Sequence, residues 1–189
     1  MTARRRKFTL LLAGLALSGV VFVGWTQEWF SVALIDGPTL SVAGDVAAPA
    51  LSTLALTCLV LIGALSIAGR FFRIVLGVLQ VLLGATMVLS GVLALVDPVQ
   101  ASSATISEAT GIAGAAPVAA QVASVAATAW PWVSTIAAAL IAATGIAVVV
   151  TGSGWPGSSR KYGATKLEPA AERTAVDDWD ALSDGSDPT

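Results

Sequence analysis

Five acidic side chains have the clearest capacity for acid–base chemistry in this chain, and they fall in two polar loops between apolar runs. They are Glu28, Asp36, Asp45, Asp97 and Glu108. Two carboxyl groups can act as general acid and general base when they converge on a substrate, but the spacing of these five gives no sign of convergence. The chain has no His, the side chain that most often transfers protons or binds metals at neutral pH.

Two other features that could carry out chemistry give equally weak signals. Cys58 is the single cysteine and lies inside an apolar run, which excludes a disulfide or a Cys-based metal site within one chain. Residues 152–157 match Gly-x-Gly-x-x-Gly, but nucleotide binding needs a strand before this string and a helix after it. Here an apolar run precedes the string and Pro156 interrupts it. We therefore predict a non-enzymatic protein with no catalytic residue, no cofactor site and no metal site.

Four long apolar runs must position everything else. With 56% hydrophobic and 12% charged residues among 189, the chain is too apolar for an ordinary soluble domain. About 20 apolar residues cross a bilayer core, and the runs at 8–25, 50–68, 74–96 and 130–151 are predicted spans. The first run could instead be a cleaved signal peptide, but it ends in Val-Phe-Val-Gly-Trp without an Ala-x-Ala site, which favours a retained helix.

The basic residues lie on one side of this four-span arrangement. All ten Lys and Arg fall in residues 1–7, 69–73 and 152–189, whereas the loops 26–49 and 97–129 contain none. Short loops rich in Lys and Arg stay in the cytoplasm. The pattern predicts a multi-pass protein of the cytoplasmic membrane, with cytoplasmic termini, a tight cytoplasmic turn at 69–73 and two extracytoplasmic loops. These basic runs do not resemble a nucleic-acid-binding surface, so the expected partner is the lipid bilayer.

Both extracytoplasmic loops contain signals for small folded elements. In residues 26–49, β-prone residues flank a turn at 36–39, which predicts a β-hairpin packed on the second loop or on the helix ends. In residues 97–129 we expect short helices at Ser102–Gly111 and Val118–Ala127. The mildly apolar stretch 112–127 is too short for a fifth span.

The predicted fold class is therefore an all-α membrane protein with four transmembrane helices, both termini inside, an extracytoplasmic β-hairpin with short helices, and a disordered C-terminal tail at 152–189. Tryptophans near the span ends predict aromatic belts at the two membrane interfaces. The expected outer belt comprises Trp25, Trp29, Trp130 and Trp132, and the inner one Trp155.

Glycines recur every seven residues in the third span, at Gly77, Gly84 and Gly91, and Gln80 shares their helix face. Small residues let helix backbones approach closely, and an amide can hydrogen-bond across such a contact. We call these four residues the seam. Packing within the bundle is the favoured interpretation; a homo-oligomer contact and a polar lining for a substrate path are the alternatives.

A second candidate motif is the lone aromatic in the acidic tail, within Trp179, Asp180 and Leu182. An aromatic residue in a polar, disordered segment is typical of a motif that folds on binding, which predicts docking of a cytoplasmic protein partner. The alternative is a tail end that only stays solvated, or that folds against its own membrane face.

Five segments of the chain carry a resemblance to known proteins: residues 25–30, 44–51, 68–70, 158–162 and 178–189. Together they resemble an actinobacterial membrane protein family associated with tryptophan biosynthesis. The resemblance covers nearly the whole chain, with one minor departure, Gly-Ser-Asp at 185–187 where the family often has Gly-Glu-Asp. It implies a cytoplasmic-membrane protein encoded near tryptophan biosynthesis genes, and it supplies no catalytic residues. The leading hypothesis is a non-enzymatic accessory protein, and the alternative is an oligomeric facilitator for tryptophan or a related aromatic metabolite.

Overall fold

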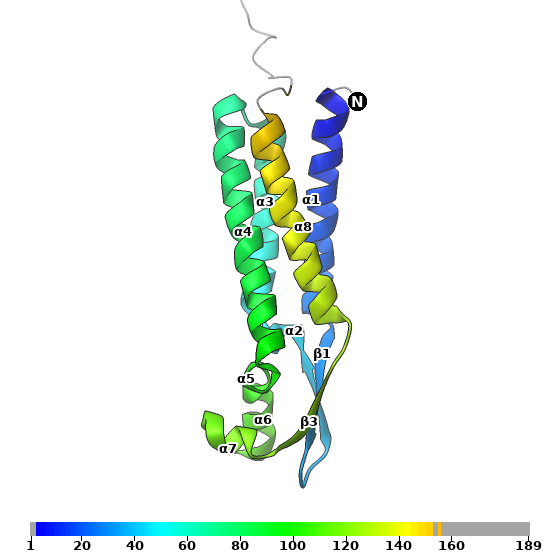
Figure 1. The fold of residues 1–189 in the computed structure, drawn as a ribbon, viewed down its shortest axis with the longest axis vertical. Coiled ribbons are helices and arrows are strands. Elements are labelled where there is room, and N and C mark those ends of the chain that lie inside the picture. Colours follow the sequence, from blue (N-terminus) through cyan, green and yellow to red (C-terminus); the bar gives the residue numbers. More distant parts are fainter. Residues whose placement is uncertain (1–2, 153–154, 156–189) are drawn as a thin grey trace, which may run out of the picture. The chain divides into compact units, whose positions relative to one another are not determined.

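The computed structural model describes residues 3–152 and Trp155, and the largest part of it is a bundle of four long helices (Figure 1). The helices are α1 Ala3–Trp25, α3 Ala50–Ile67, α4 Arg70–Val96 and α8 Trp130–Thr151. Each is long and apolar enough to cross a membrane. Proline opens α8 at Pro131, where a missing N–H is tolerated. The prediction of a mostly helical membrane protein with four spanning helices is confirmed.

Helix α4 begins earlier than the sequence pattern indicated. The turn expected at 69–73 is reduced to Ala68 and Gly69, both in extended conformation, because α4 already begins at Arg70. The prediction was wrong here because the charge of Arg73 does not end the helix. The side chain of Arg73 is buried and donates hydrogen bonds to carbonyl groups at the end of α8. In the same way, α1 includes the basic run 4–7.

A three-stranded antiparallel sheet lies beyond one end of the bundle, with β1 in the middle (Figure 1). The strands are β1 Glu28–Leu34, β2 Thr39–Ala43 and β3 Val122–Ala127. Strands β1 and β2 form the predicted hairpin, which pairs Val32 with Leu40. On its other edge Val32 pairs with Val125 of β3.

Strand β3 corrects the expectation of a helix at Val118–Ala127. The short helix α7 occupies only Ala115–Ala119, and the chain then extends along β1. The alanine-rich sequence favours helix locally, but a two-stranded hairpin is marginal in water and leaves the second edge of β1 unpaired. Pairing with β3 satisfies that edge, so a contact distant in sequence overrides the local preference.

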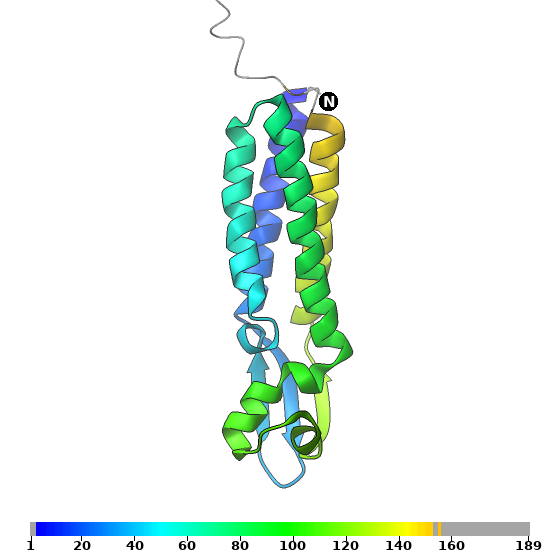
Figure 2. The ribbon, with the colours of Figure 1, turned by 90° about the vertical axis from the view of Figure 1, so that its left-hand side faces the viewer.

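Three more short helices complete this end of the molecule: α2 Gly44–Ala47, α5 Pro98–Ala101 and α6 Ser103–Thr110. Figures 1 and 2 place the sheet and α5–α7 beyond the same end of the bundle. We call residues 26–49 and 97–129 together the cap. Its buried side chains Phe30, Ile106 and Val118 belong to the same hydrophobic core as the bundle residues. The cap and the bundle are therefore packed as one body.

Trp29 attaches the cap to α1. Its ring is fully buried, and its Nε1 donates a hydrogen bond of 2.8 Å to the carbonyl oxygen of Gly24. A Cβ on Gly44 would lie 2.6 Å from Nε1 of Trp29 and 2.8 Å from the carbonyl oxygen of Trp25, so only glycine fits there. The expectation that Trp29 belongs to a lipid-facing belt was wrong. Of the tryptophans that the structure describes, Trp132 is the one that is well exposed, at 57%.

Candidate functional site

The four seam residues all lie on the buried face of α4. That face is formed by residues three or four apart, and it includes Gly77, Gln80, Gly84 and Gly91, with Arg73 at one end and Ala94 at the other. On α8, Thr135 lies against Gly91, Ala142 against Gly84 and Val149 against Gly77, so the facing residues repeat with the same seven-residue spacing. The face that carries the seam is thus covered by the chain's own α8.

At the seam the two backbones are almost in contact. A Cβ on Gly84 would lie 2.6 Å from the backbone nitrogen of Ala142, and a Cβ on Gly145 would lie 2.9 Å from that of Val81. A Cβ on Gly77 would meet the side chain of Val149 at 2.8 Å. Because peptide groups cannot move aside as a flexible side chain can, these glycines set the distance between α4 and α8.

Gln80 joins the two helices in the middle of the seam. Its Nε2 donates to Oγ1 of Thr144 at 2.8 Å and, more weakly, to the carbonyl oxygen of Ile141 at 3.4 Å. The Oγ1 of Thr144 donates in turn to the same carbonyl at 2.8 Å. Among the described residues, Oε1 of Gln80 is buried without a hydrogen-bond partner. The amide is therefore a polar contact between α4 and α8 inside the bundle.

Arg73 connects α4 to the C-terminal end of α8, at one end of the seam. The side chain is 2% exposed, and its Nη1 donates to the carbonyl oxygens of Gly152 at 3.3 Å and Trp155 at 3.2 Å. The guanidinium carbon also lies 5.4 Å from the centre of the Trp155 ring, which is a cation–π distance. A positive charge at a helix C-terminus also suits the helix dipole. We call this arrangement the Arg73 latch.

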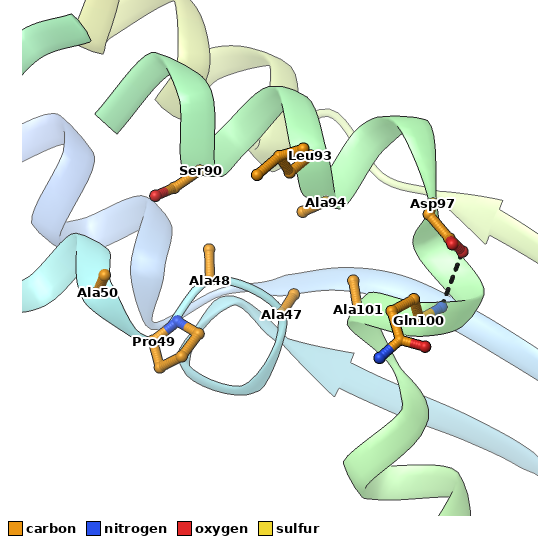
Figure 3. A pocket seen from close by; sticks show the side chains of 10 residues that line it. All are labelled: Ala47, Ala48, Pro49, Ala50, Ser90, Leu93, Ala94, Asp97, Gln100 and Ala101. Atoms are coloured by element: carbon orange, nitrogen blue, oxygen red, sulfur yellow. Dashed lines mark hydrogen bonds between the residues drawn. The ribbon is translucent and has the colours of Figure 1, made fainter. Parts of the chain in front are cut away.

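A pocket of about 470 Å³ lies at the junction of the bundle and the cap, between the start of α3 and the end of α4 (Figure 3). The two helices are joined by a two-residue link at the opposite end, and α4 leans away from α3 toward the cap (Figure 2). One wall consists of Ala47–Ala50, and the other is contributed by α4 and α5. Small side chains on both walls leave the space open.

The polar groups of the pocket come from the α4–α5 wall. Figure 3 shows Asp97 and Gln100 together at one end, Ser90 directed toward the start of α3, and Leu93 and Ala94 between them. The Oδ1 of Asp97 accepts a hydrogen bond of 2.9 Å from the backbone N–H of Gln100 and thereby caps α5. The pocket is thus apolar along most of its length and acidic at its cap end.

The other four loop acids do not line this pocket. Glu28 begins β1, Asp36 lies at the hairpin turn, Asp45 is in α2 and Glu108 is in α6. The part of the chain that the structure describes holds no group of three or more His, Cys, Asp or Glu able to bind a metal. Cys58 is buried in α3 as a free thiol.

Sequence reasoning missed Ser90 and Gln100. A signal existed: positions 90, 94 and 97 share one helix face, and the helix ends at Asp97-Pro98. The tail motif Trp179, Asp180 and Leu182 lies outside the described residues, as do the disorder predicted for the tail and most of the Gly-x-Gly-x-x-Gly string.

Comparison with known proteins identifies a family for this chain. The model of a family described as tryptophan-associated transmembrane protein matches residues 9–189, nearly the whole chain. Searches of curated proteins and of solved structures found no match. The family match agrees with the four apolar helices and with the resemblance in the sequence. This chain therefore belongs to the tryptophan-associated transmembrane protein family.

Proposed function

We propose that the chain is a non-enzymatic accessory protein of the cytoplasmic membrane, in which the helix bundle anchors the cap as an interaction module. The observation that carries the proposal is the construction of the cap. Two segments about a hundred residues apart share one sheet and one core, and Thr128 Oγ1 donates to the carbonyl oxygen of Glu28 at 2.7 Å across them. A loop that only connected two spans would not need this tertiary structure.

The charge distribution supports an orientation for the anchor. The described basic residues, in the run 4–7 and at Arg70 and Arg73, lie at the end of the bundle opposite the cap, and the five loop acids lie in the cap. By the positive-inside rule, the cap faces outward and both termini face the cytoplasm.

Thiol labelling in intact cells tests this orientation. We expect a membrane-impermeant maleimide to label an Asp36→Cys variant, and to label Gly69→Cys only after the membrane is permeabilised. Both positions are exposed at opposite ends of the bundle, whereas the native Cys58 is buried and gives little background. Labelling of Gly69→Cys alone in intact cells would reverse the assignment.

Site-specific photo-crosslinking in native membranes tests the interaction role. A photoreactive residue at Ile35, near the hairpin turn and 59% exposed, should give a discrete adduct with a second protein. The matched control is Val60, which is 75% exposed on α3 and should give only lipid adducts. A Gly44→Leu change, which no longer fits against Trp29, should abolish the Ile35 adduct. Absence of any protein adduct at Ile35 would contradict the proposal.

The tail belongs to the same proposal, as the segment that docks a cytoplasmic partner through Trp179 and Leu182. Its support is the sequence alone. The crosslinked partners of a Trp179→Ala variant should lack one cytoplasmic protein that the unaltered chain captures, and the Ile35 adduct should be kept. Identical partner sets would remove the docking role of the tail.

A facilitator for tryptophan or a related aromatic metabolite is the second candidate. The close contact of Gly84 with Ala142 argues against a path along the seam within one chain, so such a path would lie elsewhere or between copies. The family description, tryptophan-associated, favours this candidate. Uptake of labelled tryptophan by proteoliposomes at the rate of empty liposomes would dispose of it.

A further inference from the structure

The pocket at the junction of bundle and cap has the size and chemistry of a ligand site. Its volume of about 470 Å³ falls within the range of roughly 300–1,000 Å³ typical of small-molecule sites. Such sites combine apolar walls with a few polar groups that fix orientation. Here Leu93, Ala94 and the segment Ala47–Ala50 supply the apolar walls, and Ser90, Asp97 and Gln100 supply the polar groups.

Asp97 determines which charge the ligand should carry. One of its carboxylate oxygens accepts the backbone N–H of Gln100, and among the described residues the other has no hydrogen-bond or ion-pair partner. The basic residues of the described part lie at the opposite end of the bundle. Helix α4, which separates Arg70 from Asp97, is about 40 Å long at 1.5 Å per residue, several times the screening length of physiological salt. These basic side chains therefore do not neutralise Asp97.

The position of the pocket indicates the polarity of the remainder of the ligand. Pro49, in front of α3, and Asp97, just after α4, mark the level at which two spanning helices end, so the pocket lies where an apolar environment meets a polar one. An ionic contact is stronger at such a boundary than in bulk water because the effective dielectric constant is lower. A ligand with an apolar body and a terminal cation would match both parts of the pocket.

We propose that this pocket binds an ammonium-bearing amphiphile. Its ammonium group lies at Asp97, with the side-chain carbonyl of Gln100 as a second acceptor. Its apolar body lies between Ala47–Ala50 and the Leu93–Ala94 wall. Two sources share this chemistry: a free aromatic or aliphatic amine, and the ethanolamine headgroup of a membrane lipid.

Binding of phenethylamine to the full chain in phosphatidylcholine nanodiscs, measured by calorimetry, tests the proposal. We expect saturable binding that weakens at least tenfold in Asp97→Asn, because the ammonium then loses its ion pair with a carboxylate and keeps only a hydrogen bond to a neutral amide oxygen. Asparagine caps helices as well as aspartate does, so the variant should keep the cap folded. The matched control is Asp36→Asn, which removes a cap acid outside the pocket and should bind as the wild type does.

Two further measurements separate charge from bulk apolar partition. The neutral isostere 2-phenylethanol should bind at least tenfold more weakly than phenethylamine. Ala50→Leu, at an exposed position that lines the pocket, should weaken amine binding by filling its apolar part. Two results would overturn the proposal that the ligand is a free amine. One is equal binding of the amine by wild type and Asp97→Asn, and the other is equal binding of amine and alcohol by the wild type.

An experiment with added lipid distinguishes a free amine from the ethanolamine headgroup of a membrane lipid. In nanodiscs that contain phosphatidylethanolamine, a lipid occupant should compete with phenethylamine, and native mass spectrometry should show phosphatidylethanolamine retained by wild type and lost from Asp97→Asn. Binding of phenethylamine without such competition assigns the site to a free amine. If phenethylamine binding is independent of Asp97 and no phosphatidylethanolamine is retained, the proposal is wrong. None of these readouts depends on the protein adducts that test the interaction role of the cap.

Discussion

Replacing Gly84 by alanine is expected to lower the free energy of unfolding of the bundle by about 1–3 kcal/mol, the usual cost of forcing one extra methyl group into a packed interior. The new Cβ would lie 2.6 Å from the backbone nitrogen of Ala142 and 2.9 Å from its Cα. Relief requires α4 and α8 to separate, which also strains the hydrogen bond from Gln80 to Thr144. Gly84→Leu should exceed the alanine effect because it separates the helices further.

The measurement is unfolding in mixed micelles with increasing SDS, followed by circular dichroism. Gly63→Ala is the matched control: Gly63 is exposed on α3, and a Cβ there would meet nothing within 4 Å. Alanine in an exposed helix position should be neutral or stabilise by about 0.5–1 kcal/mol, because glycine loses more backbone entropy on folding. If Gly84→Ala and Gly63→Ala behave alike, the backbones of α4 and α8 do not pack as closely as described.

Replacing Arg73 by alanine is the second change with a large expected effect, a loss of about 1.5–3 kcal/mol, because hydrogen bonds to charged groups contribute that much. The change leaves the carbonyl oxygens of Gly152 and Trp155 without this donor and removes the cation from the Trp155 ring. Arg73→Lys should recover only part of the loss, since an ammonium lacks the planar fork that spans two acceptors.

Arg70→Ala is the control for Arg73, because Arg70 is in the same helical turn but is exposed. It should change the unfolding free energy by less than about 0.5 kcal/mol. A double-mutant cycle of Arg73→Ala with Trp155→Ala should give a coupling energy of about 1 kcal/mol, as expected of two residues in contact. Equal losses for Arg73→Ala and Arg70→Ala, or additive effects in the cycle, would show that the latch does not stabilise the end of α8.

The four helices could be predicted from the sequence because their signal is local. Each run of apolar residues is long enough to span a bilayer, and Asp97-Pro98 ends one of them in an obvious way. Arg73 shows the limit of this reasoning. Its charge looked like part of a turn, and only the carbonyl groups at the end of α8, some eighty residues later, make it a buried helical residue.

Strand β3 and the pocket could not be predicted, because both depend on contacts between segments that are distant in the sequence. Residues 122–127 are mostly alanine and valine, and what makes them a strand is the free edge of β1, not their own preference. The pocket arises because α3 and α4 diverge toward the cap, and no periodicity in either helix encodes that divergence. Trp29 combines both problems, since a tryptophan near a span end looks like a lipid anchor until a sheet covers it.

The central position of β1 also determines the order in which its two edges are paired during synthesis of the protein. Its first neighbour, β2, follows after four residues, but its second edge waits for β3, about ninety residues later in the chain. At ribosomal speeds of roughly 5–20 residues per second, that edge stays open for about 5–20 s while two further helices are inserted. An open edge invites pairing with a foreign strand, so a nascent chain stalled before residue 122 is the species most in need of a chaperone.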